Sequence, residues 1–169
     1  AEAVVEGLAP DRGLYFPDHI PELPEAFWFS YEDKNPWDLG AEMLAPYTEG
    51  CLTKEELQEI LRDVLNFPIP LHEIERGVFS LELFHGPTSA FKDVGARFLS
   101  RVLSRITNLR LTILVATSGD TGSAVANGFL GVPNIDVVIL YPSGRISKIQ
   151  EQQLTTAGSN IVALEVEGS

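Results

Sequence analysis

The chain has 169 residues, 44% of them hydrophobic, so it can bury a core and is not expected to be disordered. Its formal net charge of -12 at pH 7 argues against binding to nucleic acids or anionic membranes, because both require a basic face. No apolar run is long enough for a membrane span, and no signal peptide opens the sequence. Cys51 is the single cysteine, which excludes an internal disulfide and favours a reducing, cytoplasmic location. The three histidines lack ligand spacing, so no metal site is expected.

Residues 1–77 are predicted to form a small, mainly helical amino-terminal unit. This part carries the surplus acid, since residues 1–78 hold 17 Asp and Glu against 5 Lys and Arg. Thr53 and Glu56 have the spacing of a capping box, and apolar residues then recur at helical spacing up to Leu65. Pro68 and Pro70 are expected to end this helix and to begin a linker.

From residue 78 to 169 the pattern changes to alternating strands and helices. The predicted strands are residues 79–84, 111–116, 135–140 and 160–166, and the predicted helices are residues 92–107, 120–130 and 147–157. The apolar runs at 111–116 and 135–140 are typical of buried parallel strands. We therefore predict an α/β unit with a mostly parallel open sheet and flanking helices, preceded by the helical unit.

Lys92 is the first candidate for chemistry. It follows a turn rich in Gly and Pro and begins a predicted helix, where the helix dipole disfavours a cation and favours the neutral, nucleophilic amine. By itself this pattern also fits an ordinary solvated lysine near a helix start.

A turn over residues 117–122, Thr-Ser-Gly-Asp-Thr-Gly, is the second candidate. It follows the strand ending at Ala116 and opens a helix, so its backbone N–H groups and hydroxyls can face an anion. The alternative is a helix start capped by Ser118 or Asp120. The spacing of neither a P-loop nor a dinucleotide-binding glycine motif is present.

Three segments resemble the threonine synthase family: residues 81–93, residues 116–126 and residues 138–147. The opening segment, residues 7–17, is also similar to the start of that family. The resemblance covers most of the chain in the right order. Ser89 and Arg145 stand where many members carry Leu and Lys, and neither position is the expected reactive lysine.

The resemblance implies a pyridoxal-phosphate (PLP) enzyme of the tryptophan-synthase-β fold type, a lyase that converts O-phospho-L-homoserine and water to L-threonine and phosphate. It implies that Lys92 is catalytic and forms the Schiff base with the cofactor, and that Asp120 lies near the cofactor's ring oxygen. The implied substrate-binding residues are Thr88, Thr117, Ser118, Gly119, Asp120 and Thr121. The partner is thus a small-molecule substrate, with no nucleic acid and no membrane.

Family members run to more than twice this length and carry a glycine-rich loop for the cofactor phosphate that these residues lack. We therefore expect the chain to be an amino-terminal portion with little turnover alone, whose uncovered sheet favours self-association. Two alternatives stay open. One is another PLP enzyme of the same fold, such as a dehydratase or a threonine-synthase-like protein, and the other is a non-catalytic module that binds phosphorylated ligands.

Overall fold

The computed structural model describes residues 1–168, which form two compact units. The first is Ala1–Leu65 and the second begins at Asn66. The domain boundary expected between residues 77 and 78 stays a prediction. Among the described residues, no helix is both long enough and apolar enough to cross a membrane.

The first unit is helical, as the sequence predicts. Its elements are α1 (Glu2–Glu6), α2 (Glu25–Trp28), the 3-10 helix η1 (Tyr31–Asp33), α3 (Pro36–Thr48) and α4 (Lys54–Val64). The predicted capping box is confirmed, since Thr53 Oγ1 accepts from the Glu56 N–H and the Glu56 carboxylate accepts from the Thr53 N–H. The apolar face of α4 is buried against α3.

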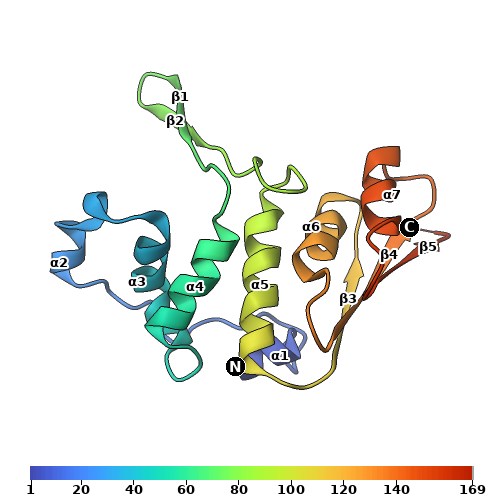
Figure 1. Cartoon of the computed structure of the whole chain (residues 1–169), viewed down its shortest axis with the longest axis horizontal. Coiled ribbons are helices and arrows are strands. Elements are labelled where there is room, and N and C mark those ends of the chain that lie inside the picture. Colours follow the sequence, from blue (N-terminus) through green and yellow to red (C-terminus); the bar gives the residue numbers. More distant parts are fainter. Residues whose placement is uncertain (169) are drawn as a thin grey trace. The chain divides into compact units, whose positions relative to one another are not determined.

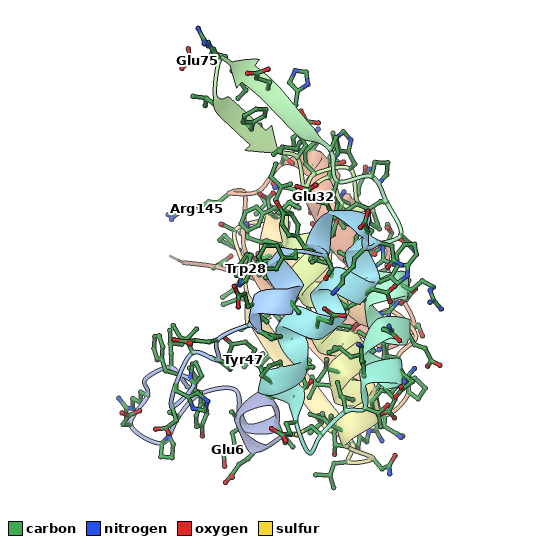
Figure 2. The ribbon with its side chains drawn as sticks, turned by 90° about the vertical axis from the view of Figure 1, so that its left-hand side faces the viewer. Glu6, Trp28, Glu32, Tyr47, Glu75 and Arg145 are labelled. Carbon is green, nitrogen blue, oxygen red and sulfur yellow. The ribbon has the colours of Figure 1, made fainter. Side chains whose placement is uncertain are left out.

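Two short strands form a hairpin that the sequence did not predict. β1 (Leu71–Glu75) pairs antiparallel with β2 (Val78–Leu81), and Gly77, at φ +79°, makes the turn between them. Figure 2 shows Glu75 at the far end of this ribbon. The residues after Pro70 are therefore a strand and not a linker. The predicted strand at 79–84 is corrected to Val78–Leu81, which pairs within the hairpin and lies outside the parallel sheet.

The parallel sheet contains β3 (Leu111–Ala116), β4 (Ile135–Pro142) and β5 (Ile161–Val166), in that order. It is connected through α6 (Asp120–Phe129) and α7 (Lys148–Thr155), while α5 (Lys92–Ile106) precedes it. Figure 1 shows α6 between α5 and the sheet, in agreement with the contacts of α6 to α5, β4 and α7. The predicted α/β architecture is confirmed, with strands and helices within three residues of the expected bounds.

The two faces of the sheet differ in burial. On the face packed against helices, the β4 side chains Val137 and Ile139 are fully buried. The opposite face carries exposed apolar side chains, which we call the uncovered face: Leu114, Val162, Leu164 and Val166. A parallel sheet is normally covered on both faces, so this surface is unusual for a complete α/β layer.

Candidate functional site

Lys92 is the first residue of α5, as the sequence predicts. Its side chain is half-buried, and the ammonium lies 4.3 Å from the centroid of the Phe91 ring. The other three lysines have different surroundings. Lys34 and Lys54 both pair with Glu42, and Lys148 is exposed. Among the ion pairs of the described residues none involves Lys92, so no carboxylate there competes for its amine.

The turn before Lys92 is fastened by the next residue along the chain. Asp93 is completely buried, and its two carboxylate oxygens accept from the N–H of Thr88 at 2.9 Å and from its hydroxyl at 2.6 Å. Gly86 leaves room for this arrangement, because a Cβ there would lie 2.6 Å from Asp93 Oδ2 and 3.1 Å from the ring of Phe67. The entry into α5, and with it the position of Lys92, is thus set by a buried hydrogen-bonded carboxylate.

The second predicted motif lies at the carboxyl end of β3, the edge where α/β sheets bind ligands. Thr117 organises it, since its Oγ1 accepts from the N–H groups of Gly119 and Gly122, both at 3.0 Å. Neither Ser118 nor Asp120 caps α6, so that alternative is wrong. Thr117 takes the capping role one residue earlier than expected.

The remaining backbone donors of this turn determine what it can bind. Within residues 1–168, the N–H groups of Ser118, Asp120 and Thr121 have no protein acceptor, whereas those of Gly119 and Gly122 are used by Thr117. Three unused N–H groups at the start of an α-helix favour an anion. The geometry supports this reading of the turn without assigning a ligand.

Sequence reasoning did not identify Gln150, the third residue of α7. Its Nε2 donates to Asp120 Oδ1 at 2.8 Å, across 30 residues of sequence. The local signal was a second capping box, Ser147 with Gln150, which gives no information about a contact with another helix. Asp93 lies in the segment 81–93, which was considered for Lys92 alone, and the burial of Asp93 was not predicted.

Five of the predicted site residues line three separate grooves. Lys92 and Thr121 share a groove of about 370 Å³ between α5 and α6, whose other walls are almost entirely apolar. Thr117 and Ser118 line one of about 330 Å³ over the ends of β3, β4 and β5. Thr88 lines a smaller one of about 150 Å³ near Ser123. Lys92 and Thr121, at the starts of α5 and α6, therefore line one groove, whereas Thr88 lines another.

One titratable group beside the second groove has a shifted pKa. Burial raises the pKa of the Tyr141 phenol, and the negative charges of Glu165 and Glu151 raise it further. Tyr141 is therefore a neutral phenol near pH 7. No group of three or more His, Cys, Asp or Glu residues in the described part of the chain could hold a metal ion.

Comparison with known proteins supports the resemblance. A family model described as "Threonine synthase N terminus" matches residues 1–64. Threonine synthase of Haemophilus influenzae is 44% identical over 95% of this chain and 38% of its own length. The chain spans about two fifths of the length of the curated relatives that it matches.

Solved structures agree with this result over nearly the whole chain. The crystal structure of threonine synthase from Escherichia coli has a TM-score of 0.91 and 42% identity, covering 99% of this chain and 40% of that one. The X-ray structure described as PLP-bound threonine synthase from Brucella melitensis also has a TM-score of 0.91, with 37% identity, covering 99% of this chain and 38% of that one. Sequence and structure together show that nearly the whole of this chain is similar to about two fifths of a threonine synthase.

Proposed function

We propose that this chain carries the lysine-bearing part of a PLP-dependent lyase that converts O-phospho-L-homoserine and water to L-threonine and phosphate. The observation that carries the proposal is the groove between α5 and α6, where Lys92 stands at the start of one helix and Thr121 at the start of the other. The relatives are named threonine synthases, and one of the solved structures is described as PLP bound.

The residues present fit the cofactor in two respects. Lys92 is a half-buried amine without a carboxylate partner among the described residues, beside apolar walls that can pack against an aromatic ring. The cofactor, when bound, supplies an electron sink for carbanion chemistry. Lys92 would hold it covalently, and Asp120 would contribute to its binding.

The chain's own groups have separate tasks in this proposal. Once the substrate amine had replaced it on the cofactor, the free Lys92 Nζ would take the proton from the α-carbon of the substrate and return protons later in the reaction. Thr117, Ser118, Gly119, Asp120 and Thr121 would orient the anionic substrate. The three unused N–H groups, of Ser118, Asp120 and Thr121, support that role. The Thr88 N–H and hydroxyl both already donate to Asp93, so Thr88 could assist only as an acceptor, through its carbonyl or the lone pairs of its hydroxyl.

The proposal is tested by borohydride reduction after incubation with pyridoxal phosphate, followed by peptide mapping. The chain has four lysines, which makes the assignment unambiguous. Label concentrated on Lys92, and lost in Lys92→Ala but not in Lys148→Ala, supports the proposal. Label spread evenly over Lys34, Lys54, Lys92 and Lys148 contradicts a formed lysine site in this chain.

Two finer points accompany this function. The unpaired cysteine supports a cytoplasmic location. The uncovered face supports self-association of the 169-residue chain, because β5 is an edge strand with exposed Val162, Leu164 and Val166.

A further inference from the structure

We propose that Gln150 is a positioning residue, which fixes Asp120 and the turn 117–122 in the orientation used for binding. The use of that turn rests on the proposed function, whereas the contacts of Gln150 do not. Gln150 belongs to α7, and the turn belongs to the start of α6. The two helix starts are joined by the hydrogen bond from Gln150 Nε2 to Asp120 Oδ1.

The glutamine amide has one orientation that satisfies all its neighbours. Its Oε1 faces Ser147, whose N–H lies at 3.3 Å and whose hydroxyl lies at 3.1 Å. Its Nε2 faces the Asp120 carboxylate, which as an ionised group can only accept. An inverted amide would place oxygen against oxygen at Asp120, so the donor direction runs from Gln150 to Asp120.

Gly119 makes room for this contact. It has φ +145°, and a Cβ at this position would lie 2.4 Å from Gln150 Nε2 and 2.6 Å from its Cδ. The glutamine amide therefore lies directly against the backbone of the turn as well as against Asp120. Two neighbouring positions of the turn, 119 and 120, depend on the same side chain.

An exposed aspartate at the first position of a helix has several accessible rotamers of its own. The bond from Gln150 selects one of them. Because the N–H groups of Asp120 and Thr121 belong to the same short turn, holding the Asp120 side chain and the Gly119 backbone also restrains the direction of those donors. Gln150 thus acts on the site through Asp120, without touching a ligand itself.

The substitution Gln150→Glu separates this role from ordinary helix stability. Glutamate at the third position is a standard partner in a capping box, so the start of α7 keeps its hydrogen bonds to Ser147. The donor towards Asp120 is lost, and two carboxylates then face each other. The pair Asp120→Asn with Gln150→Glu exchanges donor and acceptor and restores one hydrogen bond between the same positions.

Amide hydrogen exchange of the full 169-residue chain, measured by NMR without cofactor, tests the inference. In Gln150→Glu the amides of Gly119 and Gly122 should exchange about tenfold faster than in the wild type, while amides of α7 change less than about twofold. In the double variant Asp120→Asn with Gln150→Glu, the amides of Gly119 and Gly122 should regain most of their protection. Restoration by the pair distinguishes a specific hydrogen bond from a general loss of packing.

Unchanged amide exchange at Gly119 and Gly122 in Gln150→Glu would overturn the inference. The inference would also fail if these amides were as unprotected in the double variant as in the single variant. Because no cofactor is present, this outcome is independent of the proposed function. Failure of wild-type Lys92 to take up pyridoxal phosphate would count against the proposed function alone. Where Lys92 is labelled, Gln150→Glu should lower that label at limiting pyridoxal phosphate.

Discussion

Asp93 and Thr88 are joined by two hydrogen bonds, one to each carboxylate oxygen, and one of them comes from the backbone and the other from the hydroxyl. Asp93 is fully buried and directly follows Lys92. A buried carboxylate that loses a donor incurs a desolvation cost larger than the net value of an ordinary hydrogen bond. The Thr88 hydroxyl therefore matters more for stability than its single bond suggests.

Thr88→Val should lower the free energy of unfolding by about 2 kcal/mol, because the side-chain volume is kept while Asp93 Oδ1 loses its donor. Thr88→Ser keeps the hydroxyl and is the matched control, with a loss below about 1 kcal/mol. Urea unfolding followed by circular dichroism measures both. Equal losses in the two variants would contradict the prediction, because the hydroxyl would then matter no more than the methyl group that Thr88→Ser removes.

The order of elements from Lys92 onward was predictable because each one has a strong local pattern. The apolar run at 111–116 is confirmed as β3 with those bounds, and the helix start at Lys92 is confirmed as well. Both depend on residues that are neighbours in sequence. The predicted family, fold class and α/β alternation therefore followed from short segments read one at a time.

The features that the sequence did not predict all depend on distant partners or on turns. The hairpin was missed because Pro68 and Pro70 suggested a linker, and proline is also compatible with the residues before an edge strand. The bond between Gln150 and Asp120 joins residues 30 positions apart, which no local pattern indicates. The predicted roles of the site residues themselves stay predictions, because they depend on groups outside this chain.

Two glycines in neighbouring helices should respond in opposite directions to the same substitution. A Cβ added at Gly95 in α5 would meet no atom within 4 Å, whereas a Cβ at Gly128 in α6 would lie 3.0 Å from the backbone of Ala96. Gly95→Ala should stabilise the chain by up to about 1 kcal/mol through helix propensity. Gly128→Ala should destabilise it by about 1–3 kcal/mol by forcing α5 and α6 apart.

Thermal and urea unfolding of Gly95→Ala and Gly128→Ala measure the change in stability of each variant relative to the wild type. Each variant is the control for the other, because both add one methyl group to a helix. Stabilisation by Gly128→Ala would contradict the close approach of α5 and α6 at Gly128 and Ala96.

Glu42 should make the stability of the helical unit depend on pH. The hydrogen bond from Lys34 lowers its pKa below the ordinary value of 4.5, and the charges of Lys34 and Lys54 add to this, against a smaller effect of burial. A lowered folded-state pKa gives stability that is present above about pH 4.5 and is lost as the pH falls through the folded pKa. Glu42→Gln should therefore cost at most about 1 kcal/mol at pH 7 and nothing near pH 2.

The difference in unfolding free energy between wild type and Glu42→Gln, measured at intervals from pH 7 to pH 2, checks this. Lys54→Met removes only the partner at 3.5 Å and should leave most of the pH dependence in place. A difference that stays constant over the whole range would rule out titration of Glu42 as its cause.

The uncovered face gives the last prediction. Leu114 is 68% exposed and lies in register with Val138, which in turn pairs with Val162. Contiguous exposed apolar side chains on a sheet favour association. In sedimentation velocity at matched concentration, Leu114→Glu should therefore contain more monomer than the wild type. Its unfolding free energy should change little, because an exposed position loses few contacts.

The matched control is Ile149→Glu, at 70% exposure on α7, which adds the same charge away from this face and should sediment like the wild type. If both variants dissociated the chain equally, net charge and not this face would control association, and a wild type that is monomeric throughout would refute self-association.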